Sequence, residues 1–313
     1  MAITNYMRDS VSPKDVPYVD ALTEEAPILE LLPMQPTNKG MIQVIEKLKS
    51  TDAAQLVDLD GELPTISSDS SLEDVTLSVL GGRMVVGEDA AKKFGGVAAW
   101  FTKKLGPILK KTGSNLEYSL IYNTWRAYAT ANSKNLDAGG TTGSSQYSIL
   151  AVKFVEDETF GLFNPDGFGT GKVFDILPLN NGAASDYLLG NGVTTVGYAQ
   201  RLKAYFGIQT ANTRNIGAIV NVELTADATT DTGYKALPTE AQMDDLLESV
   251  RAMPGNTFLM MHPKVANALS VYKGGRLEMT VLDDNMKRKL KAWEDIPIIT
   301  SRNFLNGTEA VVS

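Results

Sequence analysis

The stretch from residue 50 to residue 82 constrains the fold most, because it combines charge of one sign with apolar residues at both ends. It contains no Lys or Arg but seven acidic residues: Asp52, Asp58, Asp60, Glu62, Asp69, Glu73 and Asp74. Apolar and polar residues alternate at 53–57 and 75–80, which is typical of strands, and the residues between them favour a turn. A long β-arm of this kind is weakly stable alone and is usually held by a partner. The alternative is an ordinary solvated hairpin with a chance charge bias.

Composition indicates a folded globular protein of roughly two domains. The 313 residues are 43% hydrophobic and 21% charged, which excludes global disorder. A net charge of −8 argues against a protein whose main task is to grip nucleic acid, because phosphate neutralisation needs clustered Lys and Arg. There is no cysteine, no signal peptide and no apolar run of about 18 residues. We therefore expect a cytosolic product without disulfides or a membrane span.

Two helices are predicted in the first half of the chain. Residues 88–112 have a helical apolar period, and Pro107 is expected to break or kink this helix. Ser114 and Glu117 have the spacing of a capping box, so a second helix is expected to begin there and to end near Asn132.

Strands and shorter helices are predicted in the rest of the chain, without an internal repeat. The expected elements are a hairpin at 147–163, strands at 193–206, 216–224, 257–261 and 296–300, a helix capped by Thr239 and Gln242, a helix that opens at Pro263, and a last strand at 309–312 after a turn at Asn306 and Gly307.

No group of residues has the pattern of a catalytic, cofactor-binding or metal site. His262 is the only histidine, and its place between a strand and a helix favours a structural role. Residues 166–173 resemble a phosphate loop but lack its first Gly and its closing Ser or Thr. Residues 58–61 resemble half of a calcium loop, but Ser67 stands where the closing Glu is needed. We expect no enzyme activity, no cofactor and no metal.

The order of these elements resembles the major capsid protein of tailed bacteriophages, whose Johnson fold is shared by encapsulins. The segments that carry the resemblance to its podovirus and siphovirus branch are Glu62–Thr65, Val79–Gly82, Phe160–Pro165, Phe258–Pro263 and Trp293–Ile298. The resemblance covers nearly the whole chain. It implies an α+β fold with an N-arm, an E-loop, a P-domain with a long spine helix, and an A-domain.

The resemblance also implies a division of the chain and a function. The parts are an N-terminal arm at 1–40, an E-loop at 41–87, a P-domain at 88–209 with a spine helix at about 114–132 and a β-rich middle, an A-domain at 210–295, and terminal P-domain strands at 296–313. The implied function is a structural protein that self-assembles into hexamers and pentamers of an icosahedral phage head around double-stranded DNA. Implied partners are further copies of the chain, portal and scaffolding proteins, a cement protein as a further candidate, and DNA without sequence-specific contact. The virion is the implied location, after synthesis in the host bacterial cytoplasm.

Two features found within this family are not expected here. A self-formed Lys-to-Asn crosslink that starts from the E-loop needs a loop lysine, and residues 50–82 contain none. The sequence starts at Met1, so an N-terminal scaffold domain removed by proteolysis is not expected either.

We expect the acidic arm to lie over basic residues of an adjacent subunit, because a closed assembly repeats one heterologous contact. Each exposed ion pair contributes only about 0.2–1 kcal/mol, but several per arm add up to a contact that salt weakens. The candidate residues are Asp58, Asp60, Glu62, Asp69, Glu73 and Asp74 on the arm, and Lys103, Lys104, Lys110 and Lys111 on the facing surface. The alternatives are an encapsulin-like compartment, another phage structural protein such as a tail-tube subunit, and an α/β enzyme whose chemistry the sequence does not reveal.

Overall fold

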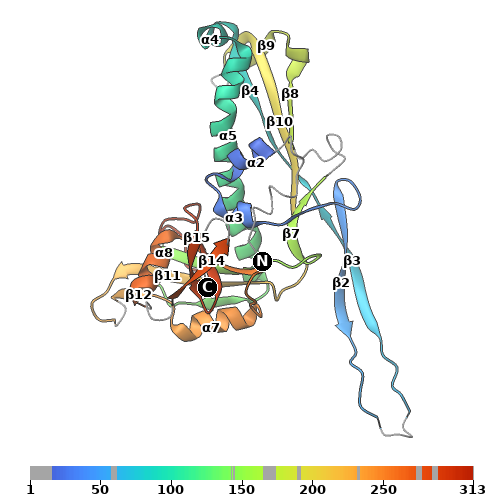
Figure 1. Ribbon diagram of the computed structural model, residues 1–313, viewed down its shortest axis with the longest axis vertical. Helices are drawn as coiled ribbons and strands as arrows, with labels where there is room; N and C mark the ends of the chain where they lie inside the picture. Colours follow the sequence, from blue (N-terminus) through green and yellow to red (C-terminus); the bar gives the residue numbers. More distant parts are fainter. Residues whose placement is uncertain are drawn as a thin grey trace.

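The computed structural model describes residues 16–57, 62–141, 143, 145–164, 174–188, 192–230, 233–272, 277–283 and 288–312. A long helix lies beside a six-stranded sheet, a compact unit is built on an eight-stranded sheet, and a two-stranded hairpin projects away from both (Figure 1). This is the mixed α+β architecture that the sequence predicts.

The long helix is one continuous element that begins after two glycines with positive φ, Gly95 and Gly96. It consists of α5 (Val97–Ser119), the π-helical segment η1 (Leu120–Arg126) and α6 (Ala127–Ala131), and the short helix α4 (Glu88–Lys93) precedes it. Pro107 lies inside α5 and does not end it. The predicted helix start at Ser114 is wrong, because the chain is already helical there and Glu117 is buried in contact with other segments.

The six-stranded sheet is organised around its longest strand, β10 (Thr194–Thr210). On one edge β10 pairs antiparallel with β4 (Ser78–Gly87). On its other edge it pairs in turn with β7 (Thr159–Phe163), β8 (Phe174–Pro178) and β9 (Ser185–Leu188), and the 3-10 turn η2 (Leu179–Gly182) joins β8 to β9. β1 (Met34–Pro36) adds parallel to β7. The helices α2 (Val16–Thr23) and α3 (Pro27–Leu31) bury their apolar side chains in the same core as α5.

The eight-stranded sheet forms the core of the compact unit. Its strands, in spatial order, are β12 (Tyr234–Ala236), β11 (Ile216–Ala226), β6 (Gln146–Lys153), β13 (Thr257–Met261), β16 (Ile296–Thr300), β15 (Arg288–Trp293) and β14 (Leu277–Asp283), with β5 (Asn135–Asp137) beside β11. The helices of this unit are α7 (Glu240–Ser249) and α8 (Pro263–Tyr272). The capping box predicted for α7 is confirmed, since Thr239 and Gln242 exchange both of its hydrogen bonds.

Two predicted strand pairings are wrong. Residues 147–163 do not form a hairpin, because β6 belongs to the eight-stranded sheet and β7 to the six-stranded sheet, so the turn between them connects the two sheets. The last residues do not form a strand either. Glu309 makes one isolated bridge with Gln146, and side chains hold the rest of this segment in place.

Candidate assembly surfaces

The arm predicted from the acidic stretch is the hairpin of β2 (Ile42–Thr51) and β3 (Ser68–Thr76), which form a sheet of their own (Figure 1). Its strands lie closer to the body of the molecule than expected, because the predicted strand at 53–57 is outside β2. The predicted strand at 75–80 is divided between the end of β3 and the start of β4. The hairpin is therefore continuous in sequence with the six-stranded sheet.

One face of the hairpin base packs against its own chain. Ile45 is buried, and Val75 packs against the cluster of Leu77, Phe160 and Leu162. Glu73 pairs with Ile45 in the β-ladder and so lies on the same face. Burial and the charge of Glu73 raise the pKa of Tyr128, which lies in α6. Glu73, predicted as a contact to a neighbour, thus also acts within its own subunit.

The opposite face of the hairpin carries apolar side chains that the described residues leave exposed or only partly covered. Val44 pairs with Asp74 and Ile42 with Thr76 in the ladder, and Leu72 lies on the same face of β3. Leu72 is 75% exposed, and Ile42 is exposed as well. A solvated hairpin with only a charge bias does not require apolar residues here, so this face favours a docked arm over that alternative.

The far end of the hairpin is closed by Asp52, whose carboxylate accepts hydrogen bonds from the Ser67 amide at 3.1 Å and the Ser67 hydroxyl at 2.7 Å. These bonds lower the pKa of Asp52. Beyond this pair the described residues expose four large apolar side chains, Leu56, Val57, Leu63 and Ile66. The sequence predicts a strand at 53–57 and a turn-rich tip after it, whereas the structure has no strand at 53–57 and exposes these apolar side chains beyond the end of β2.

The structure describes four of the six acidic residues predicted to contact a neighbouring subunit. Glu62, Asp69, Glu73 and Asp74 are exposed on the hairpin, whereas Asp58 and Asp60 lie outside the described residues. β2 also carries Lys47 and Lys49, so lysine is present in the hairpin although residues 50–82 have none. The absence of a crosslink stays a prediction.

The predicted basic residues lie on α5, away from the hairpin of their own chain (Figure 1). Lys103, Lys104 and Lys111 are exposed, and the Lys103 ammonium lies 5.5 Å from the centre of the Phe94 ring. Lys110 forms an ion pair with Glu24 at 2.6 Å. Lys110 therefore has a partner within its own subunit, and the other three lysines are better placed to meet a neighbour.

A second exposed apolar surface lies at the end of the six-stranded sheet that is opposite to the hairpin tip (Figure 1). Its large exposed side chains come from β8 to β10: Leu177, Leu188, Val193 and Val196. The sequence predicts a strand in this region but does not indicate that these residues point to solvent. The hairpin tip and this surface are at opposite ends of the molecule, so they can meet only between different copies.

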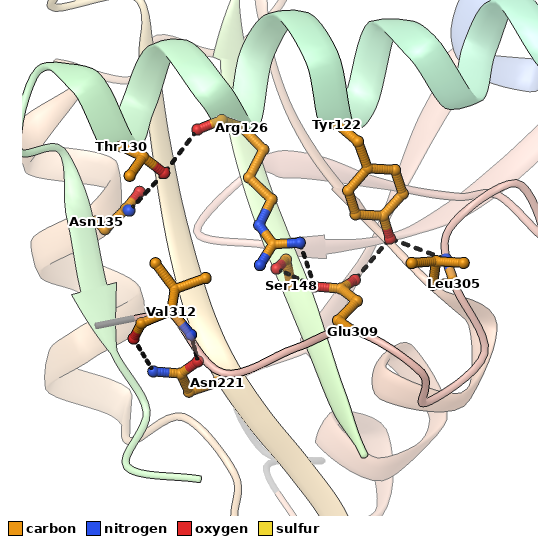
Figure 2. Close-up of polar contacts among 9 residues, drawn as sticks. All are labelled: Tyr122, Arg126, Thr130, Asn135, Ser148, Asn221, Leu305, Glu309 and Val312. Atoms are coloured by element: carbon orange, nitrogen blue, oxygen red, sulfur yellow. Dashed lines mark hydrogen bonds and ion pairs between the residues drawn. The ribbon is translucent and has the colours of Figure 1, made fainter. Parts of the chain in front are cut away.

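A polar network fixes the C-terminal residues to the long helix, as Figure 2 shows. The fully buried carboxylate of Glu309 lies 2.9 Å from the guanidinium of Arg126 and accepts hydrogen bonds from Tyr122 at 2.6 Å and Ser148 at 2.5 Å. Burial raises the pKa of Glu309, and Arg126 opposes that effect. Burial and Glu309 also raise the pKa of Tyr122. The network joins helix, sheet and C-terminal segment at one point.

A second buried carboxylate, Glu117, joins α5 to both ends of the chain. One oxygen accepts the backbone amides of Ile28 at 2.8 Å and Leu29 at 3.3 Å. The other accepts the Ser301 hydroxyl and the Asn303 side-chain amide, the latter at 3.0 Å. Burial raises the pKa of Glu117, and these four donors partly offset that effect. Glu117 is thus a structural acceptor, which explains why its apparent capping-box position is misleading.

The described part of the chain contains no cluster of three metal-ligating side chains. None of its helices is long and apolar enough to cross a membrane. His262 accepts the Lys264 amide at 3.1 Å through Nδ1, and its pKa is lowered by burial and by nearby Lys264 and Arg302. This is the structural role predicted for His262. The loop at 166–173 lies outside the described residues.

A long helix beside a sheet, a separate compact sheet unit and a projecting hairpin are the parts of the tailed-phage capsid fold. A chain of bacteriophage Epsilon15, solved by cryo-EM, has this arrangement with a TM-score of 0.55 and 17% identity, over 90% of this chain and 88% of that one. A chain of the bacteriophage JBD30 capsid has a TM-score of 0.53 and 10% identity, over 86% of this chain and 88% of its own. No family model matches the sequence, and no curated protein is significantly similar to it. The fold predicted from the sequence, that of tailed-phage major capsid proteins, is confirmed.

Proposed function

We propose that this chain is the structural subunit of a phage head, and that it self-assembles into hexamers and pentamers of an icosahedral shell around double-stranded DNA. The observation that carries the proposal is the hairpin of β2 and β3, which exposes apolar side chains far from its own core. Exposed apolar surface of this kind marks an interaction site. The fold shared with a chain of the JBD30 capsid supports a shell as the assembly.

The proposed domain division follows the architecture. The E-loop corresponds to the β2–β3 hairpin, the P-domain to the long helix and the six-stranded sheet, and the A-domain to the eight-stranded sheet with α7 and α8. This division differs from the sequence-based one at three places. β16 lies inside the eight-stranded sheet, so we assign it to the A-domain and not to terminal P-domain strands. β5 and β6 lie in the same sheet and also go to the A-domain, whereas β4 pairs with β10 and goes to the P-domain. The N-terminal arm includes α2 and α3, which pack on the P-domain helix.

The relative size of the two kinds of contact decides what holds the arm on its neighbour. Full burial of one Leu or Ile side chain contributes about 1.5–3 kcal/mol, whereas an exposed ion pair contributes about 0.2–1 kcal/mol. The tip alone exposes Leu56, Val57, Leu63 and Ile66. Apolar contacts therefore supply most of the binding energy, while the acidic residues and Lys103, Lys104 and Lys111 fix the register and the association rate. Salt is expected to weaken assembly without abolishing it.

The proposed partners follow from the role as a shell subunit. The chain contacts further copies of itself, and portal, scaffolding and cement proteins are proposed as additional partners. The net charge of −8 is consistent with DNA that is enclosed without sequence-specific binding. The proposed location is the virion, after synthesis in the host bacterial cytoplasm, and the role is structural and not catalytic.

The test is to express the full chain and examine its high-mass fraction by electron microscopy, beside a variant with Leu56→Ser and Leu63→Ser. Closed shells from the unaltered chain, and fewer or none from the variant, support the proposal. Open tubes instead of shells support a tail-tube subunit, and shells that capture a co-expressed enzyme support an encapsulin-like compartment. A monomer or small dimer at every salt concentration, with or without a crowding agent, contradicts self-assembly by the chain alone and favours the enzyme alternative.

The ion-pair component has a separate test. Charge reversal at Lys103 and Lys104 together is expected to raise the protein concentration needed for assembly and to reduce its dependence on salt. Lys264→Glu, at an exposed site on α8, is the control for a charge reversal outside α5. Equal assembly and equal salt dependence in all three proteins excludes these lysines as the partners of the arm.

A further inference from the structure

We propose that residues 53–57 of one copy add as a strand to the open edge of β4 in a second copy, with Leu56 in the groove between β4 and α5. This inference rests on the proposed function, because it names the surface of the neighbouring subunit that receives the arm.

β4 forms one edge of the six-stranded sheet. Its ten residues pair with β10 on one side, and no strand in the described part of the chain pairs with its other side. An open edge of this length presents backbone N–H and C=O groups that can pair with another chain. Near the middle of the edge lie two consecutive glycines, Gly81 and Gly82, and a Cβ added at Gly82 would meet nothing within 4 Å. A second backbone can therefore approach β4 closely here.

A groove of about 470 Å³ lies between this edge and α5. Much of its lining is apolar: Met84 and Leu202 come from the sheet, and Ile108 and Leu116 come from α5. Ile108 and Leu116 are only half-buried. Gly82 pairs with Leu202 in the ladder and so lies on the same face of the sheet, toward α5. The groove therefore has space for a large apolar side chain from an added strand.

Residues 53–57 have the properties of a strand that lacks a partner. Their sequence alternates as a strand does, yet they lie beyond the end of β2 and form no ladder in the structure. In an extended conformation Ala54 and Leu56 point to one side, and Gln55 and Val57 point to the other. Leu56 is fully exposed within its own subunit. Pairing with β4 therefore satisfies backbone groups on both partners and buries Leu56 in the same step.

The charge around the groove is opposite to that of the arm. Arg83 on β4 is exposed, and so are Lys104 and Lys111 on α5. Both lysines lie on the same side of α5 as Ile108, because they precede it by four residues and follow it by three. The arm carries seven acidic residues and no basic ones between residues 50 and 82. Figure 1 shows the hairpin pointing away from α5 and β4, so residues 53–57 and the groove meet only between two copies.

Single cysteines test this contact, because the natural chain contains none. Full chains with Leu56→Cys are mixed with full chains that carry Asn115→Cys and a short tag, and the mixture is assembled and oxidised. Asn115 is exposed and lines the groove. The tag distinguishes mixed dimers from dimers of one kind by mass. We expect mixed disulfide dimers to form at least about tenfold faster than when Lys264→Cys, at an exposed site on α8, replaces Asn115→Cys.

The outcomes separate this docking site from the proposed shell. Shells in which the two mixtures react at equal rates overturn the docking site and leave the shell standing. A chain that forms neither shells nor mixed dimers overturns the docking site and contradicts self-assembly as well.

A filled groove gives a second test. Gly82→Leu places a side chain in the open space and is expected to raise the protein concentration needed for assembly at least about tenfold, without lowering the urea midpoint of the unassembled chain. Gly143→Leu, at an exposed glycine with equally open space, is the control. Amide exchange of residues 78–87 in the unaltered chain should slow on assembly, because an added strand covers the open edge. Assembly that Gly82→Leu does not affect, or exchange of 78–87 that does not change, excludes strand addition at β4.

Discussion

Replacement of Gly113 by Ala is expected to destabilise the protein, although helix propensity alone predicts the opposite. Gly113 lies inside α5 where α2 crosses it, and an added Cβ would lie 1.8 Å from the carbonyl oxygen of Leu22. The obstacle is backbone and cannot rotate away, so α2 has to move by roughly 1.5 Å to restore ordinary contact. Overpacking of this kind costs about 1–3 kcal/mol, and the severity of the overlap indicates the upper end. Ala gains about 1 kcal/mol over Gly in a helix, which leaves a net loss of about 2 kcal/mol.

The assay is urea unfolding of the unassembled chain, together with amide exchange of residues 16–23. Gly113→Ala is expected to shift the urea midpoint down and to speed exchange in α2, because Val19 and Leu22 lose part of their packing. Asn115→Ala, an exposed substitution in the same helix, is the control and is expected to be neutral or stabilising by a few tenths of a kcal/mol. Unchanged or increased stability of Gly113→Ala, with α2 equally protected, refutes the close contact.

Three further perturbations test other parts of the structure. Glu117→Gln is expected to lower the free energy of unfolding in urea by about 2–4 kcal/mol, because an amide leaves two of the four donors to Glu117 unpaired. The control Glu248→Gln, at an exposed site on α7, is expected to stay within about 0.5 kcal/mol of the unaltered chain. Equal effects of the two substitutions refute the role of Glu117 as a buried acceptor. The hydrogen bonds from Ser67 lower the pKa of Asp52 in the folded protein. The Asp52–Ser67 contact is therefore fully present above the pKa of the unfolded carboxyl and is lost as pH falls through the folded pKa. Hydrogen exchange of the Ser67 amide, corrected for its intrinsic rate, should lose protection over that pH range. Asp52→Ala should remove that pH dependence, and an unchanged profile contradicts the assignment. Leu63→Ser should lower assembly without lowering the urea midpoint of the unassembled chain, since Leu63 is 79% exposed; a lower midpoint places it in the subunit's own core.

Local signals predict an element correctly when the same residues serve no other contact. Thr239 and Gln242 have capping-box spacing and form a capping box at the start of α7. Ser114 and Glu117 have the same spacing, yet they lie within a continuous helix, because Glu117 is used to bind Ile28, Leu29, Ser301 and Asn303. These partners are far away in sequence, so no local pattern reveals them.

Strand pairing was harder to predict than strand position. The strands β13 and β16 have the predicted bounds, and β10 and β11 lie close to theirs. β6 and β7 are buried on both faces, so no alternation of apolar and polar residues indicates which sheet each one joins. The last residues are apolar and follow an Asn-Gly turn, but Asn221 and Glu309 hold them through side chains and not through a β-ladder.

The arm was the part of the candidate surface that the sequence predicted best. Its one-signed charge and apolar ends predicted a projecting hairpin, and the structure contains one, but its strands are not at the alternating segments 53–57 and 75–80. The distribution of its contacts was not predictable from those features. Whether Ile45 or Leu72 faces the body depends on the strand register, and Lys110 pairs with Glu24 from a distant segment.

The most direct test of the proposed shell subunit is a cryo-EM reconstruction of particles formed by the full chain. The proposed function predicts a closed shell in which the β2–β3 hairpin of each subunit lies on an adjacent chain, with Leu56 and Leu63 covered. Particles in which the hairpin contacts only its own chain contradict this account, and so does a chain that remains monomeric under all assembly conditions.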